Sequence, residues 1–340
     1  IDLALDLEAD RMQGSLFTEQ DVESERTVII AERQGSENEP LFRLGEAVQA
    51  AAFQVHPYHH DVIGDMADLE SIRRDQLYQH YRTYYEPTNA VLTLAGDFET
   101  ERMFRRIQEL YAAIPAGAAP AQHADPEPPQ YDERQVTVEG PGETTYIQAC
   151  YHAPEATHPD FWPFLVLDSL LSGPTSLNMF GGGISNKTSR LYRALVEGEL
   201  AVNVHGGLGA TIDPHLYTIL LTLRPDRVPS EALQAVEQEI DRLQQAPPKP
   251  EELQRALKQA RALFAYGSES ITNQAFWLGF SEMIATFDWF THYLARIEQV
   301  TPADVQRVAQ QYLRVQRRTL GIYQPNGEQA MPAMEGEDEA

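Results

Sequence analysis

Two stretches of this sequence match without a gap at an offset of 228 positions, and this repeat restricts the possible folds more than any other feature. Residues 70–98 read ESIRRDQLYQHYRTYYEPTNAVLTLAGDF, and residues 298–326 read EQVTPADVQRVAQQYLRVQRRTLGIYQPN. Apolar positions coincide in the two copies, as Ile72 and Val300 illustrate. Each copy predicts an amphipathic helix, a short turn and a strand of alternating apolar residues. We therefore expect two related domains.

The segments around the repeat predict the domain boundaries. Residues 1–117 form the first domain, and the Pro/Ala-rich residues 118–130 read as an extended linker. The second domain, residues 131–325, opens with strands (RQVTVEG and TTYIQACYH) and continues with helices, which indicates an α+β fold. Each domain is expected to be an antiparallel sheet covered by helices. Residues 326–340 are expected to be an acidic, disordered tail.

The first copy is shorter than the second. If both had the same length, the first would begin about 98 residues before Ile1. We therefore expect a first domain that is truncated at its N-terminus, without its opening strands and first helices. The surface meant for those elements would favour self-association.

Composition excludes several classes of protein. The net charge of −25 argues against binding to nucleic acid or to an anionic membrane surface, since both need clustered Lys and Arg. No apolar run approaches the roughly 18 residues of a membrane-spanning helix. The single cysteine, Cys150, excludes internal disulfides and is expected to be a small core residue. The chain begins with Ile rather than Met, so the compartment stays open, cytoplasmic or periplasmic if the source is bacterial.

Two acidic residues stand out on the helix predicted after residue 18. At about 100° per residue, Val22, Val28 and Ile29 define an apolar arc roughly 120° wide. Glu25 and Glu32, seven residues apart, fall within about 20° of each other inside that arc. This pattern predicts two carboxylates that face the core. Without further information, a misjudged helix face or a buried Arg partner would also explain it.

Five segments in order, IDLALDLEADRM, VESERTVIIAE, HPYHHDVIGDMADLESI, YYEPTNAVLTLAGDF and SRLYRALVEGELAVNV, resemble the pitrilysin/insulinase-type (M16) zinc metallopeptidases. The family includes mitochondrial processing peptidases and bacterial zinc proteases. The resemblance implies two α+β halves around a peptide chamber, with an inverted zinc motif, His-x-x-Glu-His, in the active half. It also implies that Glu32 is the third zinc ligand of the intact site and Glu25 a supporting acid.

The sequence departs from the family pattern in the metal site itself. His-x-x-Glu-His occurs nowhere in the 340 residues. Zinc catalysis needs three protein ligands, a bound water and a general base, of which this chain offers one ligand. We therefore expect zinc in the intact parent protein, no bound zinc in this chain, and no hydrolysis of peptides by this chain alone.

The second domain does not replace the missing residues. The offset places Leu253 opposite Glu25 and Ala260 opposite Glu32, so this domain is expected to be non-catalytic. The family often uses an Arg and a Tyr of this half to hold the substrate or transition state. The corresponding positions here hold Val196 and either Val202 or Asn203.

Two further motifs carry weaker signals. The glycine-rich stretch MFGGGISNKTSRLYRALVEG resembles the flexible loop that borders the peptide chamber, which makes Asn178, Gly181, Gly182 and Gly183 weak substrate-binding candidates. A plain turn at a helix entry explains the stretch equally well. The HPYHH segment, residues 56–60, is interpreted as a shaped loop rather than a metal site.

Two functions are compatible with these features. In the first, the chain is most of a zinc metalloendopeptidase that hydrolyses peptides or unfolded protein segments through a zinc-activated water. In the second, it is a non-catalytic subunit that completes the chamber of an active partner. The expected partners are a peptide or unfolded protein substrate, and a second copy or a second subunit of this family.

Overall fold

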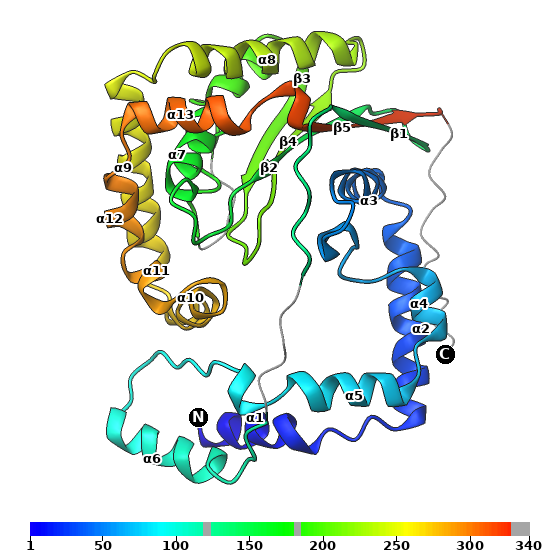
Figure 1. Ribbon diagram of the computed structural model, residues 1–340, viewed down its shortest axis with the longest axis vertical. Coiled ribbons are helices and arrows are strands. Elements are labelled where there is room, and N and C mark those ends of the chain that lie inside the picture. The colour runs from blue at the N-terminus through cyan, green and yellow to red at the C-terminus, as the bar shows by residue number, and fades with distance from the viewer. Residues whose placement is uncertain (118–123, 180–184, 328–340) are drawn as a thin grey trace, which may run out of the picture. The chain divides into compact units, whose positions relative to one another are not determined.

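The computed structural model describes residues 1–117, 124–179 and 185–327 (Figure 1). The chain forms two compact units. The first unit comprises Ile1–Gln34 and Asp61–Asp125, and the second comprises Gly35–His60 and Pro126–Ala340. Residues 35–60, which the sequence places in the first domain, thus pack with the second unit.

The second unit contains one five-stranded sheet in the order β1-β5-β2-β4-β3. The strands are β1 (Arg134–Gly140), β2 (Tyr146–Ala153), β3 (Ala201–Leu208), β4 (His215–Leu223) and β5 (Arg318–Pro325). This arrangement confirms the predicted α+β class with a sheet covered by helices. The sheet is mixed rather than antiparallel, because β5 inserts between β1 and β2 and runs parallel to β1.

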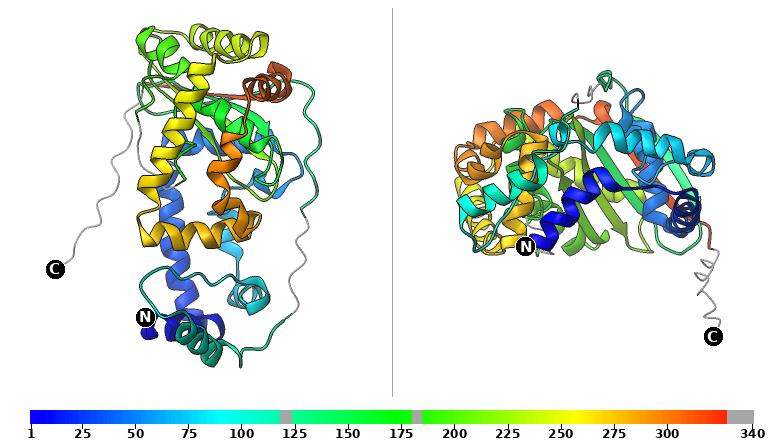
Figure 2. Two further views of the ribbon diagram at one scale, coloured as in Figure 1. Left: turned by 90° about the vertical axis from the view of Figure 1, so that its left-hand side faces the viewer. Right: turned by 90° about the horizontal axis from the view of Figure 1, so that it is seen from below.

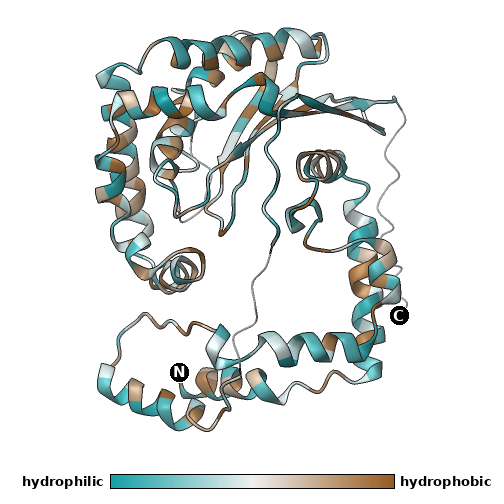
Figure 3. Ribbon diagram, viewed as in Figure 1, coloured by the Kyte–Doolittle hydropathy of each residue, from teal (hydrophilic) through white to brown (hydrophobic). Residues whose placement is uncertain are grey.

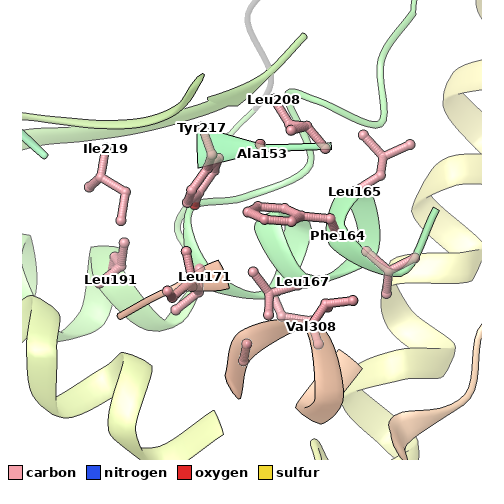
Figure 4. Close-up of a cluster of buried hydrophobic side chains, with 14 of the residues drawn as sticks. Ala153, Phe164, Leu165, Leu167, Leu171, Leu191, Leu208, Tyr217, Ile219 and Val308 are labelled. Atoms are coloured by element: carbon pink, nitrogen blue, oxygen red, sulfur yellow. The ribbon is translucent and has the colours of Figure 1, made fainter. Parts of the chain in front are cut away.

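Helices cover one face of the sheet (Figure 2), and the main hydrophobic core lies between them and the strands. Its centre is α7 (Phe161–Leu171), in which every residue is buried. Figure 4 shows Phe164 and Leu167 of this helix among Tyr217, Ile219 and Val308. The helices around α7 are α8 (Pro229–Gln245), α9 (Pro250–Gly267), α10 (Ile271–Ile284), α11 (Phe287–Thr291), α12 (Tyr293–Glu298) and α13 (Pro302–Tyr312). A helix that is apolar on all sides needs such enclosure.

The other face of the sheet is covered by α3 (Pro40–Ala52), which contacts β1, β5 and β2. Leu44, Val48 and Ala52 of α3 are fully buried there. The approach is so close that a Cβ on Gly321 of β5 would lie 2.2 Å from Val48 Cγ2 and 2.8 Å from Leu44 Cδ1. Cys150 is buried in the same cluster, as a core residue should be.

The first unit is helical and has a small core. Its helices are α1 (Asp2–Gly14), α2 (Glu19–Ser36, which continues two residues into the second unit), α4 (Met66–Ser71), α5 (Arg74–Tyr84) and α6 (Thr100–Tyr111). The buried apolar side chains described in this unit are those of Leu5, Val22, Tyr81 and Met103. Four such residues are few for about a hundred positions.

The strand predicted near residues 90–95 is wrong for this chain, because the segment is extended but forms no ladder among the described residues. Val91 and Leu92 are 42% and 46% exposed. A strand needs a neighbour to satisfy its backbone groups. In the second unit, the equivalent strand β5 has β1 and β2 on its two sides.

The internal repeat extends well beyond the two matching stretches. At the offset of 228, α5 falls on α13 with both ends coinciding, and the 3₁₀ turn Pro87–Asn89 falls on Val315–Arg317. Four more pairs overlap in the same order: α1 with α8, α2 with α9, α3 with α10, and α4 with α12. Each residue of the first copy can therefore be compared with the residue 228 positions later in the second copy.

None of the helices formed by the described residues is long and apolar enough to cross a membrane.

The close contact at Gly321 gives a direct test of how α3 is held. We expect Gly321→Ala to lower the free energy of unfolding of the second unit by about 1–3 kcal/mol, since the added methyl group displaces Val48 and Leu44. Urea denaturation followed by tryptophan fluorescence measures this, because all three Trp residues lie in that unit. Gly207→Ala on β3 is the control, since nothing lies within 4 Å of its Cβ position. Equal effects would contradict the proposed tightness.

Candidate functional site

The first unit contains an apolar groove of about 430 Å³ between α2, α4 and α5. Two acidic residues, Asp21 and Glu25, line it. Its other lining residues are Phe17, Val22, Arg26, Ile29, Leu69, Ile72 and Leu77. The walls are therefore mainly aliphatic, which suits a hydrophobic segment of protein better than a small polar ligand.

Glu25 and Glu32 are both exposed in this chain, so the expectation that they face its core is wrong. The inner face of α2 instead carries Val22 and Arg33. At about 100° per residue the two carboxylates lie roughly 60–80° to one side of Val22, and Glu25 thereby reaches the groove. The error comes from a helix face that was centred too far toward Val28, which is 56% exposed.

Arginines replace the acids on the inner face of α2, and the sequence analysis did not single them out. Arg26 donates from Nη1 to the Leu69 carbonyl and from Nη2 to the Ile72 carbonyl, both at 2.6 Å. Arg33 is 7% exposed and donates to the Gly64 carbonyl at 3.1 Å. Their spacing from Val22, four and eleven residues, is the helical signal that identifies this face.

The described residues do not fit a zinc site. No group of three or more His, Cys, Asp and Glu side chains within the described ranges could hold a metal ion. Glu32 is one carboxylate without the imidazole ligands that a tetrahedral zinc centre requires. His56, His59 and His60 lie at the 3₁₀ turn Pro57–His59, where the His56 ring accepts from the Tyr58 amide, as the loop interpretation predicts.

The second unit has a hollow of about 420 Å³ beside the end of β3. It brings together Asn178, His205, Gly207 and an aromatic wall made of Phe161, Trp277, Phe280, Trp289 and Tyr293. Of the substrate-binding candidates, Asn178 thus lines a hollow, whereas Gly181, Gly182 and Gly183 lie outside the described residues.

The outer edge of β3 is closed by side chains in two places. Asn186 donates to the Val204 carbonyl at 2.8 Å, and the Leu208 amide donates to Ser176 Oγ at 3.1 Å. These bonds occupy backbone groups that an added strand would need. An extended peptide therefore cannot pair with β3 along its whole edge unless these two bonds break.

A buried carboxyl lies beneath β3. Asp168 of α7 is inaccessible to solvent and accepts a hydrogen bond from Ser172 Oγ. Burial raises the pKa of Asp168, which favours the neutral acid. A Cβ on Gly206 would collide with Ser172 Oγ at 2.2 Å and with Asp168 Oδ1 at 2.6 Å, so this strand position requires glycine. The group belongs to the packing of α7 on the sheet.

The positions equivalent to the two acids are apolar and enclosed in the second unit. Leu253 and Ala260 of α9 are 6% and 1% exposed, within the same core cluster as α7. Val202 and Asn203 are exposed on β3. The face of α9 in the second unit is thus buried in a core, whereas the equivalent face of α2 in the first unit borders an open groove.

The junction between α3 and the sheet carries a cluster of histidines. His152 Nε2 lies 3.1 Å from the Ala52 carbonyl, and His56 Nε2 lies 3.4 Å from Asp213 Oδ2. Together with His215 these rings surround Phe53. Burial lowers the pKa of both His152 and His215.

Glu127 ties the segment before β1 to the same junction. Its carboxylate accepts hydrogen bonds from the amides of Gln54, Val55 and His56 at 2.8–3.0 Å. Burial opposes the charge, but these three bonds outweigh it and lower the pKa of Glu127.

Comparisons with known proteins agree with this architecture. The family model described as peptidase M16 inactive domain matches residues 71–260. An uncharacterised zinc protease of Streptomyces coelicolor is 27% identical over 336 residues, which cover 95% of this chain and 69% of that protein. A probable mitochondrial-processing peptidase subunit beta of Arabidopsis thaliana is 24% identical, over 92% of this chain and 59% of that protein.

Solved structures show the same fold. A protease from Helicobacter pylori superposes with a TM-score of 0.85 at 21% identity, over 95% of this chain and 76% of that chain. A peptidase M16 inactive domain from Pseudomonas fluorescens gives a TM-score of 0.81 at 19% identity, over 96% and 75%.

The arginine bonds of α2 give a prediction for the first unit. Arg26→Met keeps the aliphatic stem but removes the bonds to the carbonyls of Leu69 in α4 and of Ile72 just after it. We therefore expect the free energy of local opening of α4 to fall by about 2 kcal/mol and its amides to exchange roughly thirtyfold faster. Hydrogen exchange read by mass spectrometry measures this. Arg11→Met serves as the control, because the exposed Arg11 side chain forms an ion pair with exposed Glu8 on its own helix. Unchanged exchange in α4 would contradict the assigned role.

The histidine cluster predicts a pH dependence of the second unit. A histidine with a lowered pKa in the folded state gives stability that is present above the unfolded value of 6.5 and is lost as pH falls through the lower, folded value. We expect the free energy of unfolding to fall by on the order of 1 kcal/mol between pH 7.5 and 5 for this reason. The double variant His152→Gln with His215→Gln should show a shallower slope in urea titrations. An unchanged slope would refute the assignment.

Proposed function

Because this chain belongs to the M16 peptidase family, we propose that it is most of a zinc metalloendopeptidase that hydrolyses peptides or unfolded protein segments. Residues 1–117 would be the remainder of the metal-bearing half, and residues 131–325 the non-catalytic half. The relatives named as zinc proteases support the reaction class. This chain alone is proposed to be inactive, since it lacks the histidines of the site.

The observation that carries the proposal is the contrast between α2 and α9. In the second unit, α9 packs against α7, and Leu253 and Ala260 lie in their common core. Glu25 and Glu32 hold the equivalent positions on α2. In the first unit, no helix corresponding to α7 exists among the described residues, and the groove lies open.

The duplication therefore supports the proposal that a helix equivalent to α7 occupies the groove. A helix equivalent to α7, packed on the first unit, would cover Val22, Ile29 and Leu77 as α7 covers its own neighbours. It would face Glu25 and Glu32 directly. Two carboxylates opposite a buried helix are costly unless a cation accompanies them. We propose that this helix carries the inverted zinc motif.

The residues of this chain would then have distinct roles. Glu32 would supply one carboxylate oxygen to the metal, and Glu25 would orient a neighbouring ligand through a hydrogen bond. Bound zinc in such a site acidifies a water molecule and polarises a peptide carbonyl. The second half would enclose the substrate, with the hollow at Asn178 as part of its wall.

A second function has its own support. Val196, Val202 and Asn203 occupy the positions where the family resemblance places an Arg and a Tyr that hold the substrate. A non-catalytic subunit that completes the chamber of an active partner needs neither. Against it stand the two acids, for which such a subunit has no evident use.

Zinc content separates the two functions. In the full-length gene product we expect about one zinc per chain, Glu32→Gln to remove it, and Glu25→Gln to weaken it by roughly 10–100-fold. Inductively coupled plasma mass spectrometry and cleavage of a fluorogenic peptide measure the two effects. Glu19→Gln, at the start of the same helix, is the control. A full-length product that binds no zinc would overturn the peptidase and leave the subunit.

A further inference from the structure

Half of the ten histidines of this chain lie where α3 ends or at the strand ends beside it. Brown residues recur along α3 in Figure 3, and this helix leads into residues 53–60, which we call the exit segment. The ends of β2 and β4 are adjacent, because Ala153 pairs with His215. The five histidines are His56, His59, His60, His152 and His215. Such a cluster can couple a contact to pH, since histidine titrates near neutrality.

Phe53, which is 1% exposed, lies at the centre of the cluster. Its ring centroid is 5.2 Å from that of His152 and 5.6 Å from that of His215, and the His56 ring lies at 6.0 Å. The Tyr58 ring contacts both His56 and His215, at 4.3 and 4.6 Å between centroids. We call these five residues the latch, because they hold the exit segment on the ends of β2 and β4.

The hydrogen bonds of the exit segment require a neutral imidazole at position 56. His56 Nδ1 accepts a bond from the Tyr58 amide at 3.1 Å, and only an unprotonated nitrogen can accept. The His56 side chain is buried, and its Nε2 makes no hydrogen bond within the described part of the chain, although Asp213 Oδ2 lies 3.4 Å away. A proton on Nδ1 would therefore break the cap of the 3₁₀ turn and leave a buried cation.

The surroundings of His152 also disfavour its charged form. Burial lowers the pKa of His152, and the positive charge of Arg134 acts in the same direction. The Ala52 carbonyl, 3.1 Å from His152 Nε2, and the carboxylate of Glu127 act against this shift without reversing it. The ring is thus held neutral in the closed latch.

His215 behaves in the same way for an additional reason. Burial lowers its pKa, and the neighbouring rings of His152 and His56 would repel a proton on it. A hydrogen bond with the backbone of Leu216 opposes the shift but does not cancel it. Protonation of any one ring of the latch therefore makes protonation of the next one harder while the latch stays closed.

The latch lies where the chain passes between its two units. The piece Gly35–His60 of the second unit ends with the exit segment, and the chain returns to the second unit at Pro126. Glu127 ties these two places together, since its carboxylate accepts bonds from the amides of residues 54–56 at 2.8–3.0 Å. Release of the exit segment would lengthen the free chain that leads to the first unit.

We propose that the latch is a pH-operated tether, which holds the exit segment on the ends of β2 and β4 while its imidazoles are neutral and releases the segment when they are protonated. The first unit then has a longer connection and more freedom at mildly acidic pH. The inference does not depend on the proposed peptidase, because every residue of the latch lies in the second unit.

The direction of the effect follows from the two lowered pKa values. In the closed latch, His152 and His215 take up a proton only below the ordinary value of 6.5, whereas opening restores that value. One such histidine favours the open form by up to about tenfold for each pH unit below 6.5, until the pH reaches its lowered value. Above 6.5 this contribution vanishes and the latch stays closed.

Hydrogen exchange of the exit segment measures the release. The amides of residues 54–56 and 58–60 all donate hydrogen bonds in the closed latch. We expect their protection factors, which correct for the intrinsic rate at each pH, to fall about tenfold or more between pH 7.5 and 5.5. At pH 5.5 they should lie at least about a hundredfold below those of α13 in the main core. Unchanged protection of the exit segment, or values equal to those of α13 at pH 5.5, would overturn the proposal.

Substitution separates charge from packing. His152→Gln with His215→Gln keeps an amide donor for the Ala52 carbonyl but takes up no proton in this range, so the change with pH should shrink to about threefold or less. His292→Gln, an exposed histidine at the start of α12, is the matched control and should leave the change as it is. A tenfold change that persists in the double variant would refute the role of these two rings.

Glu127→Gln tests the tether at neutral pH. The neutral amide binds the amides of residues 54–56 less strongly than the carboxylate does, so we expect their protection to fall about tenfold at pH 7.5. Glu139→Gln, on an exposed part of β1, is the control. Protection equal to that of the unsubstituted chain would contradict the part assigned to Glu127.

Single-molecule energy transfer shows whether release frees the first unit. Dyes on Glu109→Cys in α6 and Glu231→Cys in α8 report the distance between the units, and Cys150 is buried and does not compete for label. The distance distribution should be broader at pH 5.5 than at pH 7.5, and equally narrow at both in the double histidine variant. Equal widths at both pH values in the chain with its native histidines would overturn the tether.

Discussion

The packing of α3 against the sheet is the contact on which the second unit depends. Val48 and Leu44 reach the backbone of β5 only because position 321 is glycine. This contact covers the second face of the sheet, encloses Cys150 and Tyr323, and draws residues 35–60 away from the helices that precede them in sequence. The histidine cluster and the Glu127 anchor are built around its C-terminal end. A short helix thereby determines where one unit ends and the other begins.

The internal duplication allows the first unit to be interpreted by comparison with the second. Without the second unit for comparison, the exposed carboxylates of α2 and the open apolar groove would give no indication of a function. Leu253 and Ala260, the equivalent residues of α9, lie in a core with α7, and this contrast supports our proposal that a helix packs on the groove of the first unit. The comparison holds because α5 and α13 coincide along their whole length. The replacement of Leu253 and Ala260 of α9 by Glu25 and Glu32 on α2 is visible only when the two copies are compared.

Local patterns predicted local structure well. The strands at 134–140, 146–153 and 318–325 and the helix pair α5 and α13 follow from alternation and helical spacing. Features that depend on distant partners did not follow. The parallel pairing of β1 with β5 needs the order of strands in the sheet, and the extended segment near Leu92 needs a neighbour that the described chain does not provide. Arg26 and Arg33 were missed because charge alone suggested an outer face, whereas their bonds to carbonyl groups place them inside.

The position of β5 has a consequence for how the protein is made. This strand fills the gap between β1 and β2, yet Arg134 of β1 pairs with Thr319, 185 positions later. While a ribosome synthesises the intervening chain, β1 has no partner and β2 has one bare edge. Contacts between residues so distant in sequence form slowly, and unpaired edges invite aggregation in the meantime. The nascent chain must therefore be shielded, by its own helices or by a chaperone, until its final strand emerges.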